Sequence, residues 1–134
     1  MPTYSQRSLD RLKGIHPDLI TLFAEMIVHR DCSIICGLRI QEEQQALYAK
    51  GRTVKGDVVT YLDGVTKRSK HQDGLACDVI PYPEGYDEEA CKAFGELVVD
   101  VAVMLKENGK IDSEITWGGS WRWKDFPHYE IKSS

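Results

Sequence analysis

The sequence predicts a single domain of the α+β class, with helices packed on a small, largely antiparallel sheet. Three observations favour this class. The chain has 134 residues, which is typical of one domain with its own core. Segments with helical spacing of apolar residues are segregated from short apolar segments typical of strands. The chain also has no internal repeat, low-complexity segment or linker, so we expect residues 1–134 to form one domain without a separate binding module.

Four segments have the features of helices. Ser5 can cap a short helix that extends to about residue 13 and ends at Gly14. Pro17 suits the first turn of a second helix. Helical spacing predicts that the core-facing side chains of this second helix are Leu19, Ile20, Leu22, Phe23, Met26 and Ile27.

Two further helices follow. A polar helix is expected over residues 41–50, with Ala46 and Leu47 turned inward and Tyr48 as a further candidate. The longest helix is expected over residues 87–108, before Gly109. Its predicted core side chains are Cys91, Phe94, Leu97, Val98, Val101, Met104 and Leu105.

The predicted strands are short, and one long segment lacks regular structure. The strands are residues 33–38, 75–80, 115–117 and 128–131. The segment 52–70 is rich in Gly, Thr and charged residues and predicts a long loop or loose hairpin, with residues 58–60 as its one strand-like piece. Long loops in compact domains are often functional.

The charge and hydropathy exclude some classes of protein. A formal net charge of −4 argues against nucleic-acid or membrane-surface binding, which needs a basic face. Residues 1–10 lack the apolar run of a secretory signal, and no apolar stretch reaches the roughly 20 residues that span a bilayer. We therefore expect no nucleic-acid partner, no membrane insertion and a cytoplasmic location. The local basic clusters form either solvated surface or an anion-attracting cleft rim: Lys67, Arg68, Lys70, Arg122 and Lys124.

Several residue types that can carry chemistry are expected to be structural here. The four cysteines form no C-x-x-C motif, so we interpret them as reduced, buried small hydrophobes without an assigned function. His16 and His29 lie at helix ends, where a capping or surface role is expected. Core packing is expected for the tryptophans, with at least one forming a cleft wall: Trp117, Trp121 and Trp123.

The first candidate site lies in residues 69–78, which contain His71 and Asp78. Alternate side chains of a strand share a face, so Asp78 points away from the packing side of Cys77 and Val79. Because His71 precedes the strand, the turn around Gly74 must bring its imidazole back alongside Asp78.

The second candidate site lies in residues 125–130, where His128 and Glu130 share one face of the last strand. If that strand neighbours residues 75–80, His71, Asp78 and His128 can converge on one metal. A hydrolytic zinc site uses three such ligands and keeps a fourth position open for water. Asp125 and Glu130 are then both candidates for the acid that exchanges protons with water or orients a ligand imidazole, and spacing does not decide between them.

These two motifs resemble those of a known superfamily. Ser69-x-His71-x-x-Gly74-x-Ala76-x-Asp78 and Asp125-x-x-His128-x-Glu130 are similar to the motifs of the zinc D-alanyl-D-alanine carboxypeptidases, which include VanY-type peptidases. The chain is more similar to the L-alanyl-D-glutamate endopeptidase branch found in phage endolysins. Supporting segments are residues 8–19, 37–39, 43–44, 47–53 and 117–121. One departure is Ser120, where relatives often carry an acid.

The resemblance implies a D-Ala-D-Ala carboxypeptidase-like (hedgehog/DD-peptidase) zinc fold with one Zn²⁺ per chain. It implies that the zinc ligands are His71, Asp78 and His128. Asp125 would be the catalytic base and proton shuttle, and Arg39 would steady the scissile carbonyl oxygen as negative charge develops on it. Ser69 would contact substrate or the backbone of the site. Without the resemblance, Arg39 would be interpreted as a surface or capping residue.

The expected function is therefore that of a single-domain, monomeric zinc metallopeptidase that hydrolyses the L-alanyl-D-glutamate bond of the peptidoglycan stem peptide. As a phage endolysin it would accumulate in the host cytoplasm and reach the cell wall once a holin opens the membrane. One alternative is a D-alanyl-D-alanine carboxypeptidase, and the shape of the loop 52–70 is expected to distinguish the two. Another alternative is a catalytically silent domain that binds wall peptide.

Overall fold

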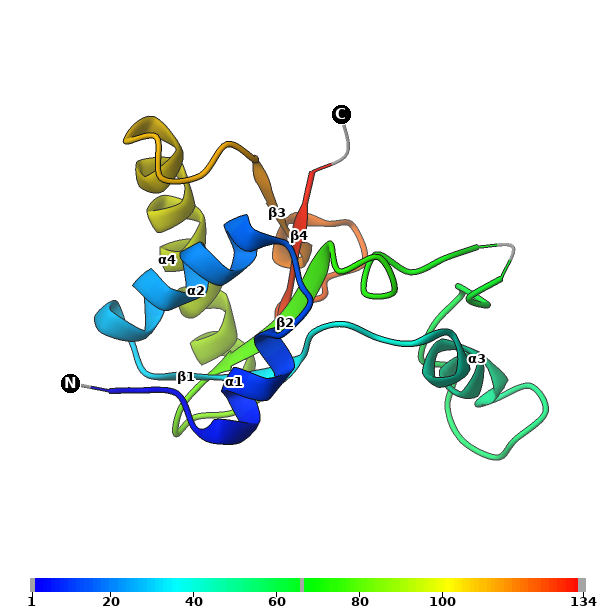
Figure 1. Ribbon diagram of the computed structural model, residues 1–134. Helices are drawn as coiled ribbons and strands as arrows, with labels where there is room; N and C mark the ends of the chain where they lie inside the picture. The colour runs from blue at the N-terminus through cyan, green and yellow to red at the C-terminus, as the bar shows by residue number, and fades with distance from the viewer. Residues whose placement is uncertain (1, 66, 133–134) are drawn as a thin grey trace.

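The protein folds as helices packed against one face of a four-stranded sheet (Figure 1). The computed structural model describes residues 2–65 and 67–132. The element order is α1 (Gln6–Leu12), α2 (Pro17–His29), β1 (Cys32–Cys36), α3 (Gln41–Ala49), β2 (Ala76–Pro81), α4 (Glu88–Glu107), β3 (Ile115–Trp117), the 3₁₀ turn η1 (Gly118–Ser120) and β4 (His128–Ile131). The predicted α+β class is confirmed.

Local sequence signals account for where the helices begin. The Ser5 side chain accepts a hydrogen bond from the Ser8 N–H at the start of α1, as a capping serine does. Pro17 opens α2, and the His16 ring accepts the Asp18 N–H, which confirms the capping role predicted for His16. The predicted bounds of α1, α3 and α4 and the predicted start of α2 hold to within one residue.

The sheet is antiparallel throughout and has the strand order β1-β2-β4-β3. β2 and β4 are neighbours, which was the condition for bringing the two motifs together. Asp78 lies directly opposite His128, and Cys77 lies opposite Tyr129. Because side chains alternate along a strand, Cys77 and Tyr129 share one face of the sheet, and Asp78 and His128 share the other.

The core lies between the first of these faces and the helices α2 and α4, which lie side by side (Figure 1). The buried Tyr129 ring contacts Phe23 of α2 and Phe94 of α4 edge-on, with centroid distances of 5.4 and 6.4 Å. Two predicted core positions are wrong: Ile20 is 38% exposed and Met104 is 39% exposed. Each lies at the border of its apolar stripe, where helical spacing is least decisive.

Three further predictions are corrected by the structure. Residues 58–60 do not form a strand, because no backbone among residues 2–65 and 67–132 pairs with them. In α3 the predicted inward residue Ala46 is exposed, whereas Gln44 is completely buried, because hydrogen bonds described below satisfy its amide. Trp123 is 83% exposed and packs neither in the core nor against the predicted cleft.

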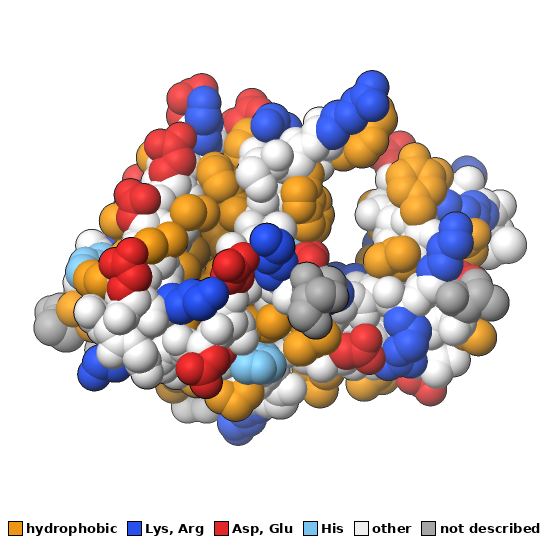
Figure 2. Space-filling view, turned by 90° about the horizontal axis from the view of Figure 1, so that it is seen from above, with side chains coloured by type: hydrophobic (Ala, Val, Ile, Leu, Met, Phe, Trp, Pro, Cys, Tyr) orange, Lys and Arg blue, Asp and Glu red, His pale blue; other side chains and the backbone are white. Residues whose placement is uncertain are grey.

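α3 and the loop that follows it form a lobe at the side of the sheet (Figure 1). The space-filling view shows the molecule hollowed between this lobe and the body that contains the sheet (Figure 2). In the part of the chain that the structure describes, no helix has the length and apolar character needed to cross a bilayer.

Candidate metal centre

The structure brings the three predicted metal ligands together on the sheet face that points away from the core. Asp78 Oδ1 lies 3.4 Å from His71 Nε2 and 3.2 Å from His128 Nδ1. The two imidazole rings lie edge to face, with centroids 5.2 Å apart. One carboxylate oxygen therefore faces a nitrogen from each of two histidines.

A tight turn at Gly74 places His71 beside Asp78. Gly74 has φ +71°, and a Cβ atom there would lie 2.7 Å from the Gly14 carbonyl oxygen, so both the backbone conformation and the close approach favour glycine. The Ser69 hydroxyl accepts the His71 N–H at 3.2 Å. Ser69 therefore contacts the site backbone, which was one of its two predicted roles.

The His71 ring is oriented by the Gly37 carbonyl, which lies 3.0 Å from Nδ1. Because a carbonyl only accepts hydrogen bonds, Nδ1 carries the proton. In the neutral imidazole, which is the form that binds a metal, the lone pair of Nε2 is then directed toward Asp78. Such fixing of the tautomer by a backbone carbonyl is typical of metal-binding histidines.

Cys36 also lies at this site, and sequence analysis assigned it no role. Cys36, His71 and Asp78 can each place one ligand atom within 4.8 Å of the others. However, the Cys36 sulfur lies 3.7 Å from His71 Nδ1, whereas Asp78 faces Nε2. Cys36 and Asp78 therefore approach different nitrogens of the His71 ring, and Cys36 is a further potential ligand beside the three predicted ones. The sequence alone did not indicate this position, because it depends on the pairing of β1 with β2, which places Cys36 opposite Asp78.

Glu130 lies behind His128 and not beside the candidate metal position. Its Oε1 is 2.7 Å from His128 Nε2, the nitrogen that faces away from Asp78. Its other oxygen accepts from the Lys70 ammonium at 2.9 Å. Glu130 is thus placed to orient a ligand imidazole, which was one of the two alternatives left open by spacing.

Asp125 lies at the rim of the same site. Its backbone is held to the last strand because its carbonyl accepts the His128 N–H at 3.2 Å. A Cβ atom at Gly118 would lie 2.3 Å from the Asp125 carbonyl oxygen, so glycine there permits the approach. Although the Asp125 side chain reaches solvent, desolvation by the cleft wall and the negative charge of Asp78 raise the pKa of its carboxyl above the usual range.

Arg39 lines the same cleft. Its backbone N–H donates to the His71 carbonyl at 2.9 Å, and its guanidinium donates to Gln44 Oε1 at 2.7 Å.

All the predicted site residues line one cleft of about 400 Å³, whose walls are Arg39, Leu47, Val59, Thr60, Leu62, Arg68, Ser69, Lys70, His71, Asp78, Trp121, Asp125, His128 and Glu130. The Trp121 ring lies against His128 at an interplanar angle of 44°, with ring centroids 5.1 Å apart, and so forms the predicted aromatic wall.

The electrostatics of the metal-free site favour positive charge on the two histidines. Burial disfavours the charged form of Asp78, but hydrogen bonds from His128 and His71 outweigh it and hold its pKa well below the usual range. Burial likewise disfavours charged imidazoles, yet the hydrogen bonds with Asp78 and Cys36 raise the pKa of His71 to about 10, and those with Asp78 and Glu130 raise that of His128 to about 8. Two imidazole nitrogens and a carboxylate oxygen are donors that Zn²⁺ prefers.

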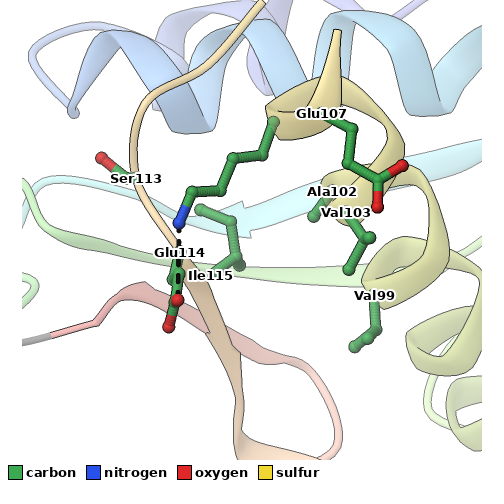
Figure 3. Close-up of a pocket in the computed structure, with 8 residues that line it drawn as sticks. Val99, Ala102, Val103, Glu107, Ser113, Glu114 and Ile115 are labelled. Carbon is green, nitrogen blue, oxygen red and sulfur yellow. Dashed lines mark hydrogen bonds and ion pairs between the residues drawn. The ribbon is translucent and has the colours of Figure 1, made fainter. Parts of the chain in front are cut away.

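A second hollow lies elsewhere, between α4 and the segment that enters β3 (Figure 3). It encloses about 500 Å³ and is lined mainly by Val99, Ala102, Val103 and Ile115. Lys106 and Glu114 form an ion pair of 3.4 Å at its rim. Among residues 2–65 and 67–132, the one group of three potential ligand atoms that all lie within 4.8 Å of one another is that of Cys36, His71 and Asp78, and none of these residues lines this hollow.

Comparison with known proteins gives consistent results. A family model described as phage L-alanyl-D-glutamate peptidase matches residues 2–134. The chain is 38% identical over 112 residues to the peptidoglycan L-alanyl-D-glutamate endopeptidase CwlK of Bacillus subtilis (strain 168); the match spans 75% of this chain and 60% of that protein. The fold is similar to the crystal structure of the Serratia marcescens L-Ala D-Glu endopeptidase ChiX, with a TM-score of 0.68 and 22% identity over 98% of this chain and 91% of the other.

Proposed function

Because the chain belongs to the phage L-alanyl-D-glutamate peptidase family, we propose that it is a zinc-dependent endopeptidase that hydrolyses the L-alanyl-D-glutamate bond of the peptidoglycan stem peptide. The observation that carries the proposal is the convergence of His71, Asp78 and His128 in a cleft that also presents Asp125 and Arg39. A merely structural zinc site would close its fourth position with a further ligand.

The donor set fits a single Zn²⁺. His71 Nε2, Asp78 Oδ1 and His128 Nδ1 would hold the ion, because the carboxylate oxygen lies 3.4 and 3.2 Å from the two nitrogens. When bound, the ion supplies Lewis acidity, which lowers the pKa of water from near 16 to about 7 and polarises a carbonyl group.

Asp125 and Arg39 would perform the remaining steps. The Asp125 carboxylate accepts a proton from the attacking water and returns it to the leaving amine. The raised pKa of the Asp125 carboxyl favours this exchange, because it brings the pKa of the base closer to those of the groups with which it exchanges protons. The Arg39 guanidinium stabilises the negative charge that develops on the scissile carbonyl oxygen.

The shape of the cleft favours an endopeptidase over a carboxypeptidase. The cleft walls come from the sheet on one side and from the α3 lobe on the other, and the surface between them is hollowed (Figure 2). A groove of this kind accommodates a peptide that continues on both sides of the cut bond, whereas removal of a terminal residue needs a pocket closed around its carboxylate.

The biological role follows as part of the same proposal. A monomer of this activity would serve as the endolysin of a phage, acting on the host wall from the cytoplasmic side after a holin opens the membrane. The family description supports a phage role.

Mass spectrometry of the products released from purified sacculi tests the proposed activity. Peptides with a new amino-terminal D-glutamate, lost on adding a zinc chelator and absent with Asp125→Ala, would support it. Release of single alanines would replace it with the carboxypeptidase function. Peptide binding without any release would favour the silent wall-binding domain.

A further inference from the structure

We propose that Gln44 is a positioning residue of the site, which holds the Arg39 guanidinium and the loop over the cleft in one hydrogen-bonded unit. The inference rests on the proposed function, since it assigns the effect of Gln44 on turnover to Arg39. It concerns a residue that lies on α3, outside both metal-binding motifs.

Gln44 is anomalous in its own helix. It is the one buried residue of α3 and has an exposed fraction of 0%. Burying a primary amide is costly unless its donors and acceptor are satisfied. The apolar pattern of α3 offers no reason for this burial, so the reason must lie in the partners of the amide.

Those partners belong to two different parts of the cleft. The amide oxygen accepts from Arg39 Nη1 at 2.7 Å, and the amide nitrogen donates to the Leu62 carbonyl at 2.6 Å and to the Thr60 hydroxyl at 3.2 Å. A guanidinium only donates and a carbonyl only accepts, so a flipped amide would lose its hydrogen bonds with Arg39 and with the Leu62 carbonyl. Arg39, Thr60 and Leu62 all line the cleft.

The neutrality of Gln44 matters as much as its geometry. The other side-chain contact of the Arg39 guanidinium is with the Cys36 sulfur at 3.5 Å, and no carboxylate among the described residues forms an ion pair with it. A neutral amide therefore fixes the direction of the guanidinium and leaves its positive charge for the substrate oxygen. A glutamate in the same place would hold Arg39 but neutralise it.

A second buried glutamine provides a matched control. The Gln72 amide accepts the Ser69 N–H at 2.8 Å and donates to the Gly64 carbonyl at 3.0 Å. It fastens the same loop but makes no contact with Arg39. Replacing Gln72 with Met therefore removes an equivalent loop anchor without altering the environment of the guanidinium.

The first test is a double-mutant cycle in the zinc-loaded enzyme, with kcat and KM measured on a soluble muropeptide that contains the L-alanyl-D-glutamate bond. Gln44→Met should lower kcat by roughly tenfold or more, because a misplaced oxyanion donor loses much of its effect. In the Arg39→Ala background the same substitution should change kcat by less than about twofold. Gln72→Met should retain kcat within about threefold. Equal effects of Gln44→Met in both backgrounds, or an equal loss in Gln72→Met, would overturn the proposal.

The second test does not depend on turnover. The Arg39 Nε–Hε group should give an ordered NMR signal in the wild type and in Gln72→Met, and a mobile one in Gln44→Met. Gln44→Glu should keep the signal ordered while lowering kcat. If the wild type releases no peptide, the proposed function fails, and the NMR comparison alone decides the positioning role: unchanged Arg39 order in Gln44→Met would refute it.

Discussion

Removing the Glu130 carboxylate should weaken metal binding even though Glu130 is not among the candidate ligands. Glu130 Oε1 lies 2.7 Å from His128 Nε2, on the far side of the ring from Asp78. In Glu130→Gln the charge-assisted hydrogen bond to the imidazole becomes a neutral one. His128 then loses basicity, and its ring loses part of its orientation.

The size of the effect can be bounded from the structure. Partners behind a ligand histidine are typically worth about 10–100-fold in metal affinity, or roughly 1.4–2.7 kcal/mol. The side chains of His128 and Glu130 are only 10% and 15% exposed, so solvent screens their interaction weakly. The substitution also leaves the Lys70 ammonium, 2.9 Å from Glu130, without its carboxylate. We therefore expect a loss toward the upper part of this range.

Competition for Zn²⁺ against a chromophoric chelator measures this loss directly. Glu114→Gln is the matched control, because Glu114 also pairs with lysines, Lys106 and Lys132, but at an exposed position away from the cleft. The control should bind zinc like the wild type. If Glu130→Gln is folded and binds zinc as tightly as the wild type, the orienting role assigned to Glu130 is wrong.

Three further outcomes follow from the structure. Asp125→Ala should abolish peptide release while zinc binding stays intact, the reverse of the pattern for Glu130→Gln; wild-type release from this variant would remove Asp125 from the mechanism. Phe23 is completely buried and contacts Tyr129. Phe23→Ala should therefore lower the free energy of unfolding, measured in urea, by about 3–5 kcal/mol, and a loss below about 1 kcal/mol would contradict the packing described. Partial burial opposes ionisation of Asp18, but hydrogen bonds from the Ser113 and Asp112 N–H groups lower its pKa. The stabilisation that the Asp18 carboxylate contributes to the folded state is therefore complete above the unfolded pKa of about 3.9, and it is lost as the pH falls through the pKa of the folded state. Asp18→Asn should accordingly be less stable than the wild type at pH 7, with the difference shrinking in acid; a difference independent of pH would show that the charge is not responsible.

Much of the fold was predictable because capping and periodicity act locally. Ser5, Pro17 and Asp87 each mark a helix start by satisfying or removing an N–H group that the first turn leaves unpaired. These signals need only the neighbouring residues, so they can be recognised without knowledge of the tertiary structure. Errors occurred where burial depends on distant partners, as for Ile20 at the border of the α2 stripe.

The candidate site was predictable to the extent that its residues fall into two short motifs. His71 and Asp78 belong to one motif and His128 to the other. Strand alternation predicted the face shared by Asp78 and His128, and the turn around Gly74 was expected to bring His71 alongside. Cys36 and Gln44 were missed for a different reason. Each reaches the cleft through a contact between elements, Cys36 through its pairing with Asp78 and Gln44 through Arg39. A polar residue on a polar helix shows no periodicity that would indicate burial.

Core and cleft depend on the same strand register, which couples folding to the site. Cys77 and Tyr129 face the core as a pair, and the next pair along the two strands, Asp78 and His128, faces the cleft. A slip of one residue between β2 and β4 would turn Tyr129 out of its contacts with the helices and His128 into the core. The aromatic packing that stabilises the sheet thus also fixes the positions of two candidate ligands from segments 50 residues apart. The pairing of β2 with β4 is therefore sufficient to bring the two motifs together at the candidate metal position.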